Sequence, residues 1–158
     1  IVATGVSQEA NDKEQLKTMI ERLKANLKGA RPERVTTDNG YFSEDNVTYL
    51  AQERIDGYVA TGRIKHGDKP LAVPRGRIPK EATLKERMSR KLRTLKGRAI
   101  YAKRKEISEP VFGQIKQVRG FRQFLLRGLS KVRAEWNLIC LGHNLLKLFR
   151  STLRPAIA

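Results

Sequence analysis

Cysteine, acidic residues, aromatic residues and long apolar runs are all scarce in this sequence. Its 158 residues include one cysteine, Cys140, which excludes an internal disulfide and suits a reducing cytoplasm. No apolar run approaches the roughly 20 residues of a membrane-spanning helix, so no membrane partner is expected. The opening Ile1-Val2-Ala3 shows no signal-peptide pattern. The length fits one domain over residues 1–158 with a single core.

The shortage of acidic residues is confined to one part of the chain. Residues 1–61 hold 8 Lys or Arg against 10 Asp or Glu, whereas residues 62–158 hold 25 against 6. A basic surplus of this size indicates a polyanion partner, and nucleic acid is the first candidate. Few aromatic residues lie in the basic part, so platforms for stacking single-stranded bases are not evident. An RNA-binding protein is therefore the weaker alternative to a DNA-binding one.

The first part of the chain alternates between strand and helix patterns. Apolar and β-branched runs predict strands over residues 1–6, 34–37 and 58–61. Apolar residues at helical spacing predict helices over residues 11–29 and after Ser43, which is placed to cap its helix. Strand, helix, strand, helix, strand is the order of a parallel α/β sheet.

The basic part opens with an irregular segment. Residues 62–82 hold three glycines and three prolines among basic residues, a pattern that predicts a basic loop insertion. Thr83 and Glu86 then have the spacing of a capping box, which predicts a helix from this point. Gly97 is the predicted end of that helix.

The next helical segment carries Glu109 among cations. On an uninterrupted α-helix, Lys105, Glu109 and Lys116 share one face. Pro110 predicts either a kink or a restart of the helix with Ser108 as its cap. An exposed ion pair between Lys105 and Glu109, four residues apart, is the plain alternative to a functional carboxylate.

A final helix is predicted over residues 130–149 from a stripe of apolar positions. Cys140 and His143 lie three residues apart on this stripe, a spacing at which two side chains can share a metal ion. Two ligands without others nearby are weak grounds for a metal site. Burial of both residues in the core is the favoured interpretation.

Asp38 lies at the carboxyl end of the predicted strand 34–37. Open α/β sheets place ligand-binding groups at the carboxyl ends of their strands. However, Asp38-Asn39-Gly40 is also ordinary turn chemistry, because such residues hydrogen-bond their own backbone and tolerate positive φ. This stretch alone leaves both the turn and the functional carboxylate open.

Three stretches together carry a family resemblance. They are Thr-Asp-Asn-Gly-Tyr-Phe-Ser at 37–43, the spacing Tyr-x3-Lys-x3-Glu-x6-Lys over 101–116 with the run Glu-Pro-Val-Phe-Gly-Gln-Ile-Lys at 109–116, and the continuation through 119–128 and 132–136. Together they resemble the carboxyl-terminal catalytic core of bacterial insertion-sequence transposases of the DDE class. The resemblance implies an α/β fold with a ribonuclease-H-like core lacking its first strand, with the basic loop as an insertion and added carboxyl-terminal helices.

The resemblance also implies a site of three carboxylates that bind Mg²⁺, two ions in the complete enzyme. Asp38 matches the second carboxylate and Glu109 the third, as catalytic residues and metal ligands. The first belongs on a strand beside residues 1–6 and has no match, so the core is expected to be amino-terminally incomplete. The expected DNA-binding residues are Tyr101, Arg104, Lys105, Lys116 and Arg119.

The implied function is metal-dependent cleavage and strand transfer of double-stranded DNA at insertion-sequence ends. A homodimer on terminal inverted repeats and target DNA, in the bacterial cytoplasm at the nucleoid, is expected. Because the first Asp has no match, the isolated chain is expected neither to cut nor to join DNA. The alternative is a catalytically inactive, DNA-binding truncated transposase that acts as a remnant or an inhibitor.

Overall fold

The sheet consists of two short parallel strands. A computed structural model describes residues 1–62 and 71–153 of the chain. Strand β1 (Arg34–Thr37) pairs in parallel with strand β2 (Asp56–Val59), and helix α2 (Glu44–Gln52) connects them. Parallel strands need such a crossover, and the mixed helix and sheet arrangement is compatible with the predicted α/β fold. Strand β2 begins and ends two residues earlier than predicted.

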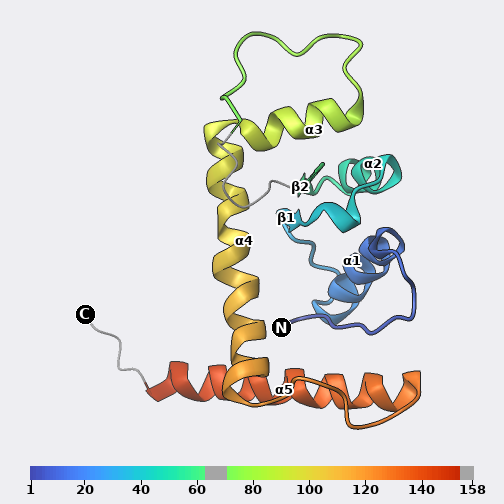
Figure 1. Cartoon of the computed structure of the whole chain (residues 1–158), viewed down its shortest axis with the longest axis vertical. Helices are drawn as coiled ribbons and strands as arrows, with labels where there is room; N and C mark the ends of the chain where they lie inside the picture. Colours follow the sequence, from blue (N-terminus) through green and yellow to red (C-terminus); the bar gives the residue numbers. More distant parts are fainter. Residues whose placement is uncertain (63–70, 154–158) are drawn as a thin grey trace.

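The main core lies where α1 (Gln15–Asn26), α2, β2 and α3 (Leu84–Arg93) meet (Figure 1). Ser43 begins α2 as predicted, because its hydroxyl accepts a hydrogen bond from the Asn46 amide at 3.1 Å. Each of these helices turns an apolar stripe toward the core. The buried residues of this core are Leu16, Ile20, Leu50, Ile55, Val59 and Met88.

Helices α3 and α4 (Leu95–Gly113) meet at a corner around Thr94. The capping box predicted at the start of α3 is present. The prediction that Gly97 ends this helix is wrong, because Thr94 ends α3 and caps α4, which places Gly97 in the first turn of α4. Gly97 is buried, and a Cβ there would collide with the Lys91 carbonyl oxygen. A close approach of two helices, not a helix end, requires this glycine.

Helix α4 is one continuous helix through Pro110, so the restart predicted at Ser108 is wrong. The Ser108 hydroxyl instead donates to the Arg104 carbonyl oxygen at 2.7 Å, one turn earlier. The helix then passes into a π-helical turn, η3 (Gln114–Val118). Lys116 lies in this wider turn, so the uninterrupted α-helix that put Lys105, Glu109 and Lys116 on one face does not hold.

Helix α5 (Leu129–Leu153) lies across the far end of α4 (Figure 1). Ile115 of η3 and Ile139 of α5 are buried there, together with Cys140 and His143. The predicted burial of Cys140 and His143 in a core is therefore confirmed. Within residues 1–62 and 71–153, no helix has both the length and the hydropathy of a membrane span.

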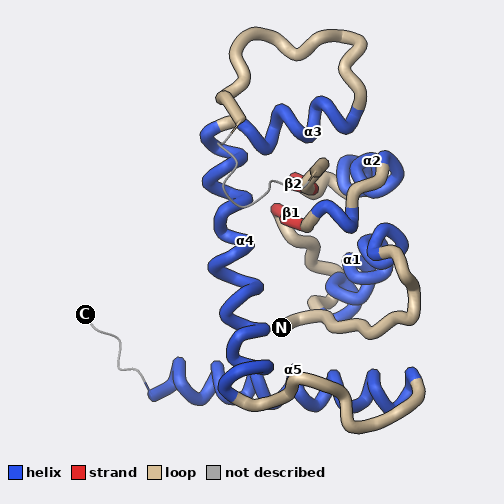
Figure 2. The backbone as a smooth tube through the Cα atoms, viewed as in Figure 1, coloured by secondary structure: helices blue, strands red, loops and turns tan. Residues whose placement is uncertain are grey.

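The strand predicted over residues 1–6 is wrong, since the only strands in the described part of the chain are β1 and β2 (Figure 2). Side chains of α1 and α5 hold the backbone of this segment instead. Arg22 donates to the Thr4 carbonyl oxygen at 2.9 Å, and Asn144 donates to that of Ile1 at 2.7 Å. No described strand runs beside the segment, so its main-chain groups have no ladder to join.

The basic loop predicted over 62–82 is irregular from residue 71 onward, which agrees with its glycine and proline content. Residues 63–70, the first part of this loop, lie outside the described residues.

Replacing Leu50 with alanine should destabilise the fold by about 2–5 kcal/mol, because the side chain is 1% exposed and its removal leaves a cavity in the main core. Urea unfolding followed by circular dichroism measures this change. Leu95→Ala on α4 is the matched control, since that side chain is 74% exposed and its loss should cost little. Equal effects of the two substitutions would show that the core lies elsewhere.

Candidate nucleic-acid and metal site

Asp38 follows β1 directly and caps a short 3-10 turn, η2 (Asn39–Tyr41). Its Oδ1 accepts a hydrogen bond from the Gly40 amide at 3.2 Å. The turn chemistry predicted for Asp38-Asn39-Gly40 is therefore present. Only one carboxylate oxygen takes part in it, so the turn does not exclude a second role for Asp38.

The other oxygen of Asp38 faces α4. Arg104 Nη2 donates to Asp38 Oδ2 at 3.0 Å, and the Tyr101 hydroxyl donates to the Thr37 carbonyl oxygen at 3.2 Å. These two bonds join the end of β1 to the middle of α4, and they bring together three of the predicted site residues. Burial raises the pKa of Tyr101 above its usual value near 10, so the hydroxyl stays a neutral donor.

The ion pair between Arg104 and Asp38 orients the carboxylate more than it stabilises the fold. The side chains are 32% and 47% exposed, and a pair this exposed contributes at most about 1 kcal/mol. Asp38 therefore remains accessible, with its orientation set by the cap on one side and by Arg104 on the other.

Glu109 lies further along the same helix and is exposed. Five residues separate it from Arg104, which corresponds to about 7.5 Å along the axis and about 140° around it. No hydrogen bond or ion pair between described residues joins Glu109 to Asp38. Lys105 is exposed as well, and no ion pair between Lys105 and Glu109 is formed.

Lys116 and Arg119 lie near the junction with α5, not beside Asp38. The Lys116 ammonium lies 5.7 Å from the centre of the Phe112 ring. Arg119 is half-buried, and its Nη1 donates to the Ile139 carbonyl oxygen at 2.9 Å. Lys116 therefore keeps an exposed charge, whereas the Arg119 guanidinium helps to attach η3 to α5.

The carboxylate oxygens of Asp38 and Glu109 are of the chemical type that divalent metal ions bind. Hard cations such as Mg²⁺ take carboxylate oxygens, and one or two carboxylates with water and phosphate oxygens suffice for Mg²⁺. Across residues 1–62 and 71–153, no group of three or more His, Cys, Asp or Glu side chains could hold a metal ion.

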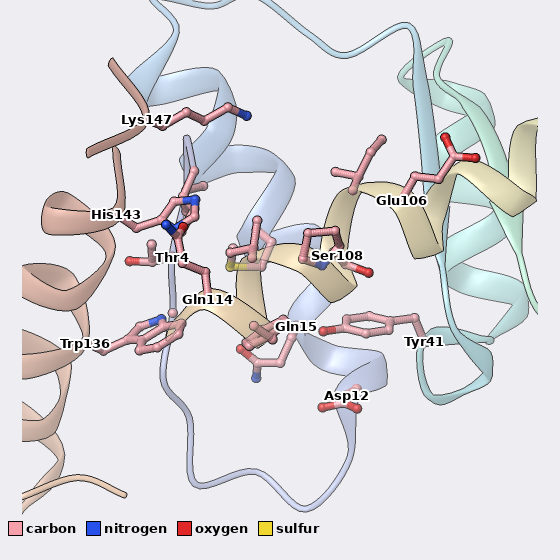
Figure 3. A pocket seen from close by; sticks show the side chains of 18 of the residues that line it. Thr4, Asp12, Gln15, Tyr41, Glu106, Ser108, Gln114, Trp136, His143 and Lys147 are labelled. Atoms are coloured by element: carbon pink, nitrogen blue, oxygen red, sulfur yellow. The ribbon is translucent and has the colours of Figure 1, made fainter. Parts of the chain in front are cut away.

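A cavity of about 980 Å³ opens between α1, α4, α5 and the amino-terminal segment (Figure 3). Asp12 and Tyr41 lie at the end near the Asp38 turn, and His143 and Lys147 lie at the α5 end. His143 is 5% exposed, and its Nδ1 has no hydrogen-bond partner among the described residues. No sequence pattern predicts this cavity, because its walls come from segments far apart in the chain.

A comparison with protein-family models found a match in the basic part of the chain. Residues 75–149 match the family model described as a transposase DDE domain. This part of the chain is similar to transposase DDE domains. The match takes in α3, α4, η3 and most of α5, just under half of the chain, and it confirms the resemblance to DDE-class transposases. No curated protein and no solved structure matches the chain.

The transposase domain contains most of the predicted site. Asp38 lies outside the matched residues, and the contact with Arg104 links it to the matched part. Domains of this class belong to nuclease and transferase families, and they generally use divalent metal ions. The predicted site residues within the match are Tyr101, Arg104, Lys105, Glu109, Lys116 and Arg119.

Burial lowers the pKa of His143 from its usual value near 6.5, which makes stability depend on pH. The unfolded chain binds a proton at a higher pH than the folded chain, so stability should fall as pH drops below about 6.5. Urea unfolding of the wild type and of His143→Gln at pH values above and below this point measures the effect. The variant should lose less stability on acidification. Parallel pH profiles would exclude a neutral, buried His143.

Proposed function

We propose that this transposase domain takes part in metal-dependent cleavage and strand transfer of double-stranded DNA at insertion-sequence ends. The supporting observation is the hydrogen bond from Arg104 to Asp38, which spans 66 positions of sequence. It joins the Thr-Asp-Asn-Gly stretch to the helix that carries Glu109, so two separate parts of the motif resemblance lie side by side. In a bacterium, this activity is expected in the cytoplasm, where the DNA forms the nucleoid.

The carboxylates and cations have separate roles in this proposal. Asp38 and Glu109 would hold divalent metal ions, Mg²⁺ by preference, together with phosphate oxygens of the DNA. Bound metal ions stabilise the attacking and leaving oxygens during in-line displacement at phosphorus. Arg104 orients the Asp38 carboxylate from α4. Lys105 and Lys116 bind phosphates as point charges, which sets the position of the duplex without reading its sequence.

A ribonuclease-H-like core accounts for the arrangement around Asp38. In this proposal β1 and β2 are two strands of a parallel sheet, and a third carboxylate completes the metal site. No carboxylate among the described residues takes that third place, since no three-ligand cluster is present there. The isolated chain should therefore bind DNA without cutting or joining it.

The alternative is a DNA-binding truncated transposase without chemistry, acting as a remnant or as an inhibitor of intact transposase. The absence of a three-carboxylate cluster among the described residues favours it, because cations alone can bind DNA without any catalysis. The two functions differ in whether a divalent metal ion held by Asp38 and Glu109 contributes to DNA binding. Asp38 and Glu109 matter for DNA binding only if they share a divalent ion with the DNA.

A homodimer on DNA completes the proposal, and α5 offers a surface for it. Leu138, Leu141, Leu145 and Leu148 are each more than half exposed and are spaced by three, four and three residues. This is the spacing of a two-helix seam, and a seam of identical residues is complementary to itself about a two-fold axis. A second copy of the chain is therefore the proposed occupant of this stripe.

Mg²⁺ should strengthen binding of the chain to duplex DNA, measured by fluorescence anisotropy against Mg²⁺-free solutions of equal ionic strength. The expected gain is about fivefold or more, the lower end of typical coupling between two ligands. Asp38→Ala and Glu109→Ala should abolish this gain, because each removes a carboxylate that bridges metal and phosphate.

Glu106→Ala is the matched control, since it removes one exposed carboxylate from α4 outside the proposed metal site. It should keep the Mg²⁺ effect. A Mg²⁺ effect that survives in Asp38→Ala would favour the alternative function. Nicking of plasmid DNA by the wild type, lost in Asp38→Ala, would refute the inactivity of the isolated chain.

Glutamate in place of Leu141 or Leu145 should convert the proposed dimer to a monomer, because it places like charges inside the seam. Light scattering coupled to size exclusion measures the mass. Leu95→Glu is the control, since Leu95 is 74% exposed on α4 and lies outside the stripe. A wild type that is monomeric at high concentration would rule out this surface as a dimer contact.

A further inference from the structure

The described part of the basic loop contains a short segment with two arginines around a glycine. Residues 74–79 read Pro-Arg-Gly-Arg-Ile-Pro, and we call them the arm. Each proline favours an extended conformation in the residue before it, so the arm is stiff at both ends. In Figure 1 the loop that contains the arm arches beyond α3, away from the rest of the molecule.

Helix α3 holds the arm by its backbone. Arg90 Nη2 donates to the carbonyl oxygen of Arg75 at 2.8 Å and also to that of Gly76. Further along the loop, Arg87 donates to the carbonyl oxygens of Lys80 and Ala82 at 3.0 and 2.9 Å. Two arginines of α3 therefore fix the loop through main-chain oxygens and leave its side chains unused.

Ile78 of the arm lies on the side of α3 and is partly exposed. Ile78 lines a cavity of about 450 Å³ together with Leu84 and Met88 of α3. The arm thus has one face toward α3 and one face toward solvent. Its position is set before any ligand binds, which lowers the entropy that binding must overcome.

The solvent face of the arm presents two cations around an open backbone. The Arg75 and Arg77 side chains are exposed, and neither donates a hydrogen bond or forms an ion pair with another described residue. Gly76 has a φ of 75°, and no atom lies within 4 Å of the place where its Cβ would stand. A ligand can therefore approach the backbone closely between the two guanidinium groups.

We propose that the arm enters the minor groove of A·T-rich duplex DNA. The minor groove is about 6 Å wide, which admits a single non-helical chain that bends at a glycine such as Gly76, but not a helix. Runs of A·T pairs narrow this groove further and strengthen its negative potential, which attracts arginine. The arm would add sequence preference to the phosphate contacts of Lys105 and Lys116, so this proposal rests on the DNA-binding part of the proposed function.

Three duplexes of equal length test the arm by fluorescence anisotropy. One contains A·T pairs, one contains G·C pairs, and one contains inosine·cytosine pairs. Inosine lacks the guanine 2-amino group, so its minor groove resembles that of A·T while its major groove keeps the acceptors of guanine. The chain should bind the A·T and inosine duplexes at least about fivefold more tightly than the G·C duplex, the lower end of one specific base contact.

The double variant Arg75→Lys/Arg77→Lys keeps both charges and should lose this preference, because lysine lacks the flat guanidinium that fits a narrow groove. Lys85→Ala, an exposed cation on α3, is the control and should weaken binding to all three duplexes alike. Circular dichroism confirms that the variants are folded.

Equal, tight binding of the wild type to all three duplexes would contradict the proposal that the arm enters the minor groove, but it would leave the proposed function standing. A preference that groups inosine with G·C would overturn it too, since that result means reading from the major groove. A preference that persists in the double lysine variant would show that the selectivity resides elsewhere. Absence of binding to every duplex would overturn both the arm and the proposed function.

Discussion

Two parallel strands of four residues each do not fold alone, because so small a sheet buries too little surface. Parallel strands also need cover on both faces. The chain meets this constraint with helices: α1, α2 and α3 contribute the buried residues of the main core, while α4 contacts both strands. The Tyr101 hydroxyl bonds the last residue of β1 as part of this cover. The position of Asp38 follows, since it is the next residue along the chain.

The ion pair between Asp38 and Arg104 joins the two parts of the sequence that differ in net charge. Asp38 comes from the part with a slight acidic surplus, and Arg104 comes from the strongly basic part. A lone carboxylate repels a phosphate backbone, whereas one paired with a guanidinium repels it less. The packing of α4 against β1 therefore places an acidic group beside a cation. This is the electrostatic environment in which a carboxylate, a metal ion and a phosphate group can share one location.

Local chemistry could be predicted from the sequence, and long-range packing could not. Strand β1 and the caps at Ser43 and Thr83 depend on neighbouring residues, and they were predicted correctly. The strand expected over residues 1–6 failed because a strand needs a partner, and side chains such as Arg22 and Asn144 took its main-chain bonds instead. Gly97 was misread because a glycine required for close packing has the same sequence signature as one that ends a helix.

The candidate site divides in the same way. The motif resemblance selected Asp38, Tyr101 and Arg104, and the structure brings them together. The motif resemblance predicts neither that α4 continues through Pro110 nor that a π-helical turn follows, because both depend on how α4 meets α5. The cavity near Asp12 and His143 was invisible for the same reason.

The corner between α3 and α4 has a mechanical consequence. With Gly97 against the Lys91 carbonyl and Thr94 bonded to both helices, the two axes cannot change their angle without breaking buried contacts. The arm at residues 74–79, which is bound to α3, and Arg104 on α4, which holds Asp38, are thus parts of one rigid helix pair. A displacement of α3 would therefore also move Arg104, and with it the Asp38 carboxylate.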